Sequence, residues 1–224
     1  MYDDQPRAGG ATMLMNRVET ALVNSPPRRW LQRFYEVRLL TALGARTPGA
    51  RAVEIGCGPG FGTTLILDKF GAASVDAVDL DPAMINRAER RLRRYGDSVR
   101  LAQGSATNLD AAFHAFGGGA DASYDAVFDF AIIHHIPNWR DALAEAARVL
   151  KPGGRFFFDE VTATALMRTS YRVLFDQPSE DRFTTGEFLA ELPRHGLDIG
   201  ERWTTRVGGD YLVGVAFRSD RGRP

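Results

Sequence analysis

A glycine-rich stretch, Ala52 to Gly62 (AVEIGCGPGFG), is the part of this sequence that points most clearly to chemistry. Its first four residues belong to an apolar run at 51–55, which is typical of a buried strand. A helix is predicted through 63–70, directly after the stretch. Glycines between a first strand and a helix let a ligand approach the main chain, where a side chain would block it. The helix N-terminus adds N–H groups and a positive dipole end, so the stretch predicts a ligand-binding loop.

The next predicted strand, 74–79, ends in an acidic residue, Asp79, which lies 23 residues after Gly56. An acidic residue at about this offset accepts hydrogen bonds from ribose hydroxyls in nucleotide-binding folds. The glycine spacing does not fit a dinucleotide fingerprint, because the sixth position counted from Gly56 is Phe61. The region also lacks the Gly-Lys-Ser/Thr of a phosphate loop. The pattern therefore favours a nucleoside-bearing ligand without a pyrophosphate.

Two adjacent histidines, His134 and His135, follow the predicted strand at 124–130 and are the local candidates for a general base. An imidazole has a pKa close to neutral pH, which suits proton transfer. Either ring can instead orient a loop through hydrogen bonds to the backbone, and that alternative stays open. His114 and His195 lie in unrelated segments, so no metal site is expected.

The elements that must position these residues alternate between strand and helix. Strands are predicted at 51–55, 74–79, 99–103, 124–130 and 155–160, with helical patterns between them. This alternation predicts a doubly wound α/β fold, with helices on both faces of a parallel sheet. Two further strands, predicted at 197–206 and 211–217, have four residues between them and must be antiparallel neighbours. We expect a mostly parallel seven-stranded sheet with a final antiparallel strand, preceded by an N-terminal helical cap.

Composition limits the classes of function. The chain has 28 Lys and Arg residues and 28 Asp and Glu residues, so its formal net charge is zero and gives no general attraction to nucleic acid or anionic membranes. The arginine-rich segment 87–94 is predicted to be the solvated face of an amphipathic helix. A single cysteine, Cys57, excludes an internal disulfide framework. With no apolar run of about 18 residues and no apolar N-terminal segment, we expect a cytoplasmic protein without a membrane or nucleic-acid partner.

Several segments, taken in order, resemble the motifs of class I S-adenosylmethionine-dependent methyltransferases. VEIGCGPG resembles the first motif, AVDLDPAMI the second and GSATNL the third, and the stretch at 124–154 resembles the region around the fourth strand. The resemblance covers roughly Arg51 to Glu160. Within the class, this segment is similar to the small-molecule enzymes of the ubiquinone/menaquinone-methyltransferase-like superfamily. It implies an enzyme that uses S-adenosyl-L-methionine as its cofactor.

The resemblance also implies a set of cofactor-binding residues at the carboxyl ends of the strands. Glu54 is expected to hold the amino group, Asp79 the ribose, and the loop glycines the methionine portion. The full set is Glu54, Gly56, Gly58, Gly60, Asp79, Leu80, Ser105, Ala106, Asp129 and Phe130. Family members usually have Asp where Ser105 stands, so the contact with the adenine amino group is expected to be weaker or to come from the backbone.

The expected domain organisation is a disordered tail (1–10), the helical cap (11–48) and the methyltransferase domain (49–224), with a lid segment at 161–183. Five aromatic residues are candidates for a lid over the acceptor, or for sealing the core: Trp30, Phe34, Tyr35, Tyr171 and Phe175. An apolar lid suggests a small, partly hydrophobic acceptor that is methylated by in-line displacement, driven mainly by proximity. The alternatives are an oxidoreductase that binds NAD or a nucleotide sugar, and a non-catalytic cofactor-binding protein with the same fold.

Overall fold

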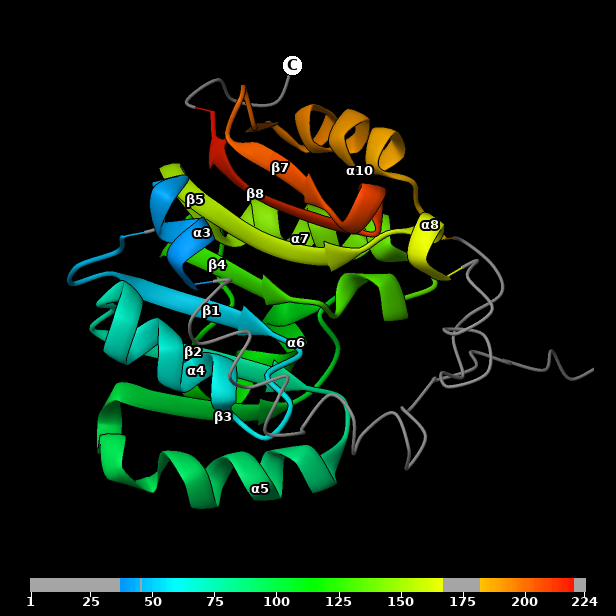
Figure 1. Ribbon diagram of the computed structural model, residues 1–224. Helices are drawn as coiled ribbons and strands as arrows, with labels where there is room; N and C mark the ends of the chain where they lie inside the picture. Colours follow the sequence, from blue (N-terminus) through cyan, green and yellow to red (C-terminus); the bar gives the residue numbers. More distant parts are fainter. Residues whose placement is uncertain (1–36, 45, 167–181, 220–224) are drawn as a thin grey trace, which may run out of the picture.

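The computed structural model describes residues 37–44, 46–166 and 182–219, and in them eight strands form one sheet (Figure 1). The strand order is β3-β2-β1-β4-β5-β8-β6, and β7 also pairs with β8. The strands are β1 (Arg51–Ile55), β2 (Ser74–Asp79), β3 (Val99–Gln103), β4 (Tyr124–Phe130), β5 (Leu150–Val161), β6 (Leu197–Asp198), β7 (Trp203–Arg206) and β8 (Tyr211–Arg218).

Helices connect these strands and cover both faces of the sheet (Figure 1). The α-helices are α3 (Val37–Ala42), α4 (Phe61–Leu65), α5 (Pro82–Leu92), α6 (Leu109–Phe113), α7 (Trp139–Val149), α8 (Ala163–Leu166) and α10 (Thr185–Glu191). A π-helical turn, η2 (Ile66–Phe70), extends α4, and the 3₁₀ turns are η3 (Arg93–Ser98), η4 (His114–Phe116), η5 (Ile133–His135), η6 (Leu192–His195) and η7 (Val207–Gly209).

The predicted α/β architecture is confirmed, because β1 to β5 run parallel and are buried between two helical layers. Side chains of β5 alternate between the two layers, as they must in a strand. Phe156 and Phe158 join the core that includes residues of α6, α7 and α10. Phe157 joins the opposite core, which includes Leu65 of α4 and Leu40 of α3. Each face of the sheet therefore has its own apolar core.

The prediction of seven strands is wrong by one, because the segment 197–206 is not a single strand. It forms β6 and β7, separated by a turn in which the Arg202 N–H bonds the carbonyl of Ile199 at 3.1 Å. Gly200 has φ +51°, and its N–H bonds the carboxylate of Asp198 at 3.1 Å. A left-handed glycine with an Asx-type bond favours a turn over extended backbone. Both short strands still pair antiparallel to β8, as expected for this part of the chain.

The predicted tail at 1–10 and most of the cap at 11–48 lie outside the described residues. The described part of the cap region contains α3, whose Val37 and Leu40 are buried against the sheet. Only the two ends of the predicted lid segment 161–183 are described, and one of them includes α8. Within the described ranges, no helix combines the length and the apolar character that crossing a bilayer requires.

The strand order reverses between β1 and β4, which lie side by side at the centre of the sheet. In doubly wound sheets, ligands bind outside the carboxyl ends of the strands at such a reversal, because the helices on the two sides diverge there. Ile55 pairs with Asp129 across the two strands, so the residues that follow β1 and β4 lie at the same edge. The glycine loop and the histidine pair both begin at this edge.

Candidate functional site

The loop after β1 exposes bare backbone at Gly58. Gly58 has φ +51°, and a Cβ at this position would meet no atom of the described residues within 4 Å. Its N–H donates to Oδ2 of Asp79 at 2.7 Å, and the N–H of Cys57 donates to the carbonyl of Val78 at 2.9 Å. These two bonds tie the loop to the end of β2, so the open backbone and the acidic residue form one unit. Such a cradle is the arrangement expected for a ligand lying across β1 and β2.

The other glycines of the loop have different tasks. A Cβ on Gly56, which has φ +64°, would overlap the side chain of Ile132 in the loop that follows β4. A Cβ on Gly60 would lie 2.7 Å from Leu92, so this glycine makes room for α5. Gly56 and Gly60 therefore let neighbouring elements approach the loop. Their predicted contacts with the cofactor stay predictions.

Gly62 was absent from the predicted set, although it belongs to the same run of glycines. A Cβ at Gly62 would overlap the carboxyl of Glu54 and lie 2.7 Å from the ring of Phe130. Glu54 is 2% exposed, and its carboxyl accepts a hydrogen bond from the hydroxyl of Thr63. Burial raises the pKa of Glu54 to about 8, because a carboxylate loses its hydration there. A buried carboxyl beside an open loop is suited to receive a cationic group.

Asp79 is the last residue of β2, and each of its carboxyl oxygens accepts a hydrogen bond from a backbone N–H. Besides the bond from Gly58, Oδ1 accepts the N–H of Asp81 at 2.9 Å. Burial raises the pKa of Asp79 above its usual value. A carboxylate has about four acceptor positions, so both oxygens keep capacity for hydroxyl donors. Asp81 accepts the N–H of Ala83 and caps α5, as its position before Pro82 predicts.

The residues predicted to enclose an adenine ring lie at the ends of β2 and β3. Leu80 is one of the few large apolar side chains that are exposed, at 39%, although it follows a buried strand. The N–H of Gly104 donates to the carbonyl of Asp79 at 3.0 Å, which draws the loop after β3 toward β2. In that loop, the Ser105 hydroxyl bonds the Thr107 hydroxyl at 2.7 Å, and Ala106 is buried. Leu80 and the loop after β3 thus lie beside the Asp79 cradle.

A second group of titratable side chains lies at the ends of β4 and β5. Asp129 is fully buried, and burial together with the nearby Glu160 raises its pKa well above the usual value. Phe130, the last residue of β4, follows Asp129 and stacks on Phe128, with ring centroids 5.9 Å apart. His134 Nδ1 lies 2.6 Å from the carboxyl of Glu160. Glu160 was not in the predicted set, although it is the last residue of the strand predicted at 155–160, as Asp79 is of the strand predicted at 74–79.

The two histidines lie in different surroundings. Their ring centroids are 4.1 Å apart in η5. Burial and the neighbouring His134 lower the pKa of His135 well below its usual value, so His135 is a neutral imidazole. His134 is 8% exposed and contacts Glu160. Sequence treated the two residues alike, and their tertiary contacts separate them.

Five predicted lid residues lie outside the described residues: Trp30, Phe34, Tyr35, Tyr171 and Phe175. Within 37–44, 46–166 and 182–219, no group of three or more His, Cys, Asp or Glu side chains could hold a metal ion.

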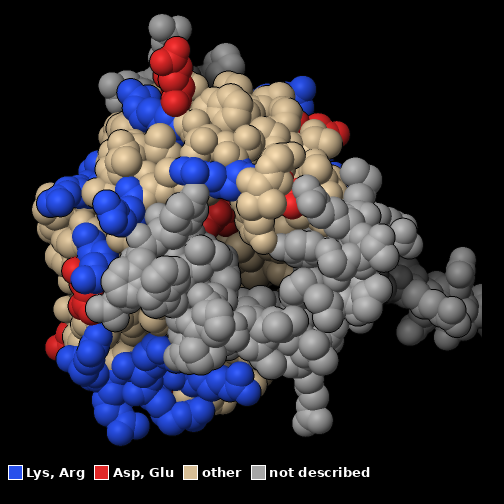
Figure 2. Space-filling model, in the orientation of Figure 1, with Lys and Arg blue, Asp and Glu red and all other residues tan. Residues whose placement is uncertain are grey.

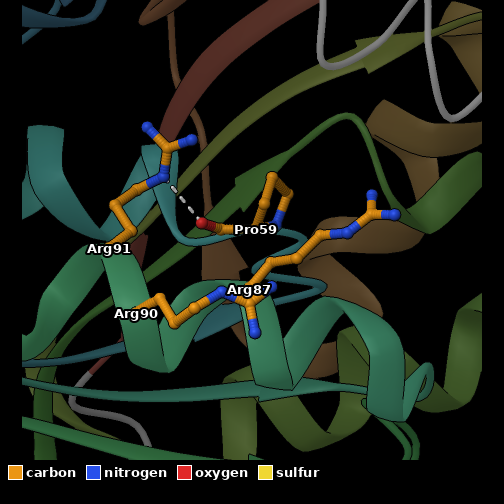
Figure 3. Close-up of a pocket in the computed structure, with 4 residues that line it drawn as sticks. All are labelled: Pro59, Arg87, Arg90 and Arg91. Carbon is orange, nitrogen blue, oxygen red and sulfur yellow. Dashed lines mark hydrogen bonds between the residues drawn. The ribbon is translucent and has the colours of Figure 1, made fainter.

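Arginine side chains gather over α5 on the surface of the molecule, which is the lower blue area in Figure 2. Buried Met84, Ala88 and Leu92 hold the opposite face of this helix against the fold, as the amphipathic pattern predicts. Three arginines and Pro59 line a surface depression there: Arg87, Arg90 and Arg91. Figure 3 shows Arg91 reaching from α5 to the carbonyl of Pro59, to which its Nε donates at 2.8 Å. Arg91 thereby supports the glycine loop from outside.

Comparison with known proteins agrees with this geometry. Residues 52–154 match the model of a family described as "Methyltransferase domain". The match contains the glycine cradle, Asp79 and the histidine pair. Residues 52–154 thus belong to a methyltransferase domain family.

Curated relatives of the methyltransferase domain act on varied compounds, according to their names. A fatty-acid O-methyltransferase of Mycolicibacterium smegmatis is 32% identical over 64% of this chain and 50% of its own length. The phthiotriol/phenolphthiotriol dimycocerosates methyltransferase of Mycobacterium leprae is 30% identical over 82% of this chain and 57% of its own length. A 24-methylenesterol C-methyltransferase 2 of Oryza sativa is 30% identical over 61% of this chain and 35% of its own length. The chain thus spans about half the length of the curated relatives it matches.

Solved structures share the fold of the methyltransferase domain. A SAM-dependent methyltransferase from Aquifex aeolicus superposes with TM-score 0.63 at 20% identity, covering 88% of this chain and 95% of its own. The 1,6-didemethyltoxoflavin-N1-methyltransferase of Burkholderia thailandensis superposes with TM-score 0.60 at 23% identity, covering 85% of this chain and 81% of its own. That structure contains bound 1,6-didemethyltoxoflavin and S-adenosylhomocysteine.

The fold of the methyltransferase domain brings most of the predicted site residues to one edge of the sheet. The loop after β1, the ends of β2 and β3, and the end of β4 all meet there, because their strands are parallel neighbours. Gly58 leaves room for a ligand, because a Cβ there would meet no atom of the described residues within 4 Å; its contact with the cofactor stays a prediction. Gly62 and Glu160 are additions, and both could be suspected from sequence: Gly62 as the last glycine of the run, Glu160 as a carboxyl at a strand end.

Proposed function

We propose that this protein transfers a methyl group from S-adenosylmethionine to a small, partly hydrophobic acceptor. The observation that carries the proposal is the bare Gly58 backbone, tied by its own N–H to the Asp79 carboxylate at 2.7 Å. One hydrogen bond thereby joins a position without a side chain to a hydroxyl-binding acid. A loop that served only to turn the chain would need neither the open space nor this link.

In this proposal, Glu54 holds the ammonium group of the cofactor and Asp79 accepts both ribose hydroxyls. Leu80 packs against the adenine, which would explain why a large apolar side chain is 39% exposed at a strand end. Ser105 and Ala106 border the adenine edge. Gly56, Gly58 and Gly60 flank the methionine portion. Gly58 is the closest, because it is the one of the three whose added Cβ would meet no described atom within 4 Å. Asp129 and Phe130 lie beside the reacting methyl group.

The cofactor, when bound, supplies a methyl group already activated by its sulfonium. The protein therefore needs to hold the acceptor in line with that group, exclude water and remove a proton where the acceptor carries one. Phe130 and the buried ends of β4 and β5 would keep water from the reacting atoms. His134 or His135 would take the proton.

The proposed acceptor class rests on the relatives and on the predicted lid. Relatives whose names specify fatty acids, phthiotriols and sterols suggest an acceptor with a large apolar portion. The aromatic residues predicted for the lid suit such a molecule. The atom that receives the methyl group differs among these relatives, so oxygen and carbon acceptors both belong in a first screen.

Calorimetry with S-adenosylhomocysteine tests the cofactor site. We expect binding of this compound and no binding of NADH, and the reverse result would favour an oxidoreductase. Asp79→Ala should weaken the binding by at least about 1 kcal/mol, or roughly fivefold, because hydrogen bonds to a charged group are lost. Asp97→Ala, which removes an exposed carboxylate elsewhere, is the control and should leave the affinity unchanged.

A screen with methyl-labelled cofactor tests turnover. Fatty acids, sterols and long-chain alcohols would be compared with small polar amines and with RNA. Label transfer to an apolar acceptor supports the proposal, whereas transfer to RNA alone would contradict the acceptor class. Cofactor binding without transfer to any member of a broad acceptor set would favour the non-catalytic alternative.

A further inference from the structure

The carboxyl of Glu160 is held in place by backbone donors from two elements. Its Oε1 accepts the N–H of Ile133 at 2.6 Å, and its Oε2 accepts the N–H of Val161 at 3.1 Å and of His134 at 3.3 Å. The side chain is fully buried. Burial of a carboxylate costs free energy that such donors offset, and three of them fix its position between β5 and η5. Glu160 is therefore a rigid acceptor.

The fixed carboxyl of Glu160 faces Nδ1 of His134. Nδ1 of His134 lies 2.6 Å from Oε2 of Glu160, in surroundings where the His134 side chain is 5% exposed. An ionised carboxylate only accepts hydrogen bonds, so this contact requires a hydrogen on Nδ1. A neutral imidazole protonated at Nδ1 carries its lone pair on Nε2. The contact thus selects one tautomer.

The neighbouring carboxyl of Asp129 favours the ionised form of Glu160, although Glu160 is buried. The Oδ1 of Asp129 accepts the N–H of Ile132 at 3.1 Å, which holds its carboxyl in the loop beside Glu160. Burial and the charge of Glu160 raise the pKa of Asp129 well above its usual value, which favours the protonated form of Asp129. Burial raises the pKa of Glu160 only to about 7. Two neighbouring carboxyls with unequal surroundings divide into one acid and one carboxylate.

The other titratable groups beside Glu160 also favour a protonated Asp129 next to an ionised Glu160. Asp159, on β5, adds negative charge that opposes ionisation of Asp129. His135 is neutral, because burial and His134 oppose its protonation. His134 contacts the Glu160 carboxylate through Nδ1. The network therefore runs from a protonated Asp129 through Glu160 to His134.

We propose that Glu160 is a positioning residue that holds His134 in the tautomer protonated at Nδ1, and so makes its Nε2 the proton acceptor of the methyl-transfer site. This inference rests on the function proposed above. As the methyl group moves to an acceptor X–H, the electron pair of the S–C bond remains on sulfur. The proton of X–H passes to Nε2, which leaves a methylated X and an imidazolium. The Glu160 carboxylate stabilises the imidazolium through Nδ1.

The first test needs no catalytic turnover and no variant beyond one for assignment. Nitrogen-15 NMR of histidine-labelled protein at about pH 8 distinguishes the two neutral tautomers by their ring shifts. The signals that disappear in His134→Asn identify the residue. We expect His134 to be protonated at Nδ1, and an Nε2-protonated ring in the wild-type protein would overturn the proposal.

The second test uses Glu160→Gln, which keeps the shape but removes the negative charge beside Nδ1. We expect affinity for S-adenosylhomocysteine to stay within about twofold and turnover to fall by at least about 100-fold, because a neutral amide stabilises the imidazolium less than a carboxylate does. The matched control is Glu191→Gln, which alters a Glu–His pair at α10, where Glu191 lies 3.2 Å from His195. It should leave both the His134 ring shifts and turnover unchanged.

The outcomes separate this inference from the function on which it rests. Loss of cofactor binding in the wild-type protein would contradict the function. Intact binding with undiminished turnover in a folded Glu160→Gln variant would contradict the role of Glu160 alone. If that variant does not fold, the tautomer of His134 in the wild-type protein still decides the matter.

Discussion

Binding of the cofactor should release a proton from Glu54. In the unliganded protein, burial raises the pKa of this carboxyl to about 8, so it is roughly 90% protonated at about pH 7. A cationic ammonium group placed against it would favour the carboxylate and lower the pKa again. We therefore expect Glu54 to release about 0.9 proton per S-adenosylhomocysteine at about pH 7, about 0.5 at pH 8 and about 0.1 at pH 9.

Isothermal titration calorimetry in buffers of different ionisation enthalpy measures this release. Glu54→Gln keeps the volume of the side chain and its hydrogen bond with Thr63, but it cannot titrate. The difference between wild type and this variant isolates Glu54 from Asp79, whose pKa is also raised. The same linkage predicts that affinity rises by up to about 50-fold from pH 6 to pH 8 in the wild type only. Equal proton release in the two proteins would refute the reasoning.

The free energy of unfolding gives an independent check on Glu54. Its folded pKa lies above the unfolded value of 4.5, so its contribution is complete below about pH 4.5 and is lost as the pH rises to about 8. The shift corresponds to at most about 5 kcal/mol over that window. Urea unfolding of the unliganded wild type should therefore lose stability with rising pH relative to Glu54→Gln. A constant difference between the two curves would contradict the raised pKa.

Two further predictions concern the support of the loop. Gly62→Ala should destabilise the fold by about 2 kcal/mol or more, because the added methyl overlaps a buried carboxyl and lies 2.7 Å from an aromatic ring. A Cβ on Gly186 would meet no described atom within 4 Å, so Gly186→Ala should stabilise α10 by up to about 1 kcal/mol. Thermal unfolding compares the two, and equal effects would refute the overlap. Arg91→Met removes the bond to Pro59 at 2.8 Å and should weaken S-adenosylhomocysteine binding by about threefold to tenfold. Arg87→Met, on the same helix, is the control for lost charge; equal weakening in both variants would show that charge, rather than the bond, matters.

Sequence was sufficient for the architecture because its signals are local. Apolar runs of strand length alternate with amphipathic helical patterns, and this order leaves a doubly wound parallel sheet as the expected fold. The carboxyl ends of parallel neighbours share one edge, so the glycine loop and Asp79 could be assigned to a common site before any coordinates, and the family resemblance added Asp129. The prediction of one strand at 197–206 failed because a single glycine, Gly200, interrupts a segment whose composition otherwise suits a strand.

Only the tertiary structure decided what each of those residues does. Gly60 and Gly58 look alike in sequence, but a Cβ on Gly60 would meet Leu92 of α5, whereas a Cβ on Gly58 would meet no described atom within 4 Å. His134 and His135 look alike as well, but the end of β5 places a fixed carboxylate against Nδ1 of His134. Protonation, too, depends on burial and on charges that come from distant parts of the chain. Sequence determines which chemical groups arrive at the edge of the sheet, because that depends on short-range patterns; packing determines their contacts and charges, because those depend on neighbours supplied by other strands.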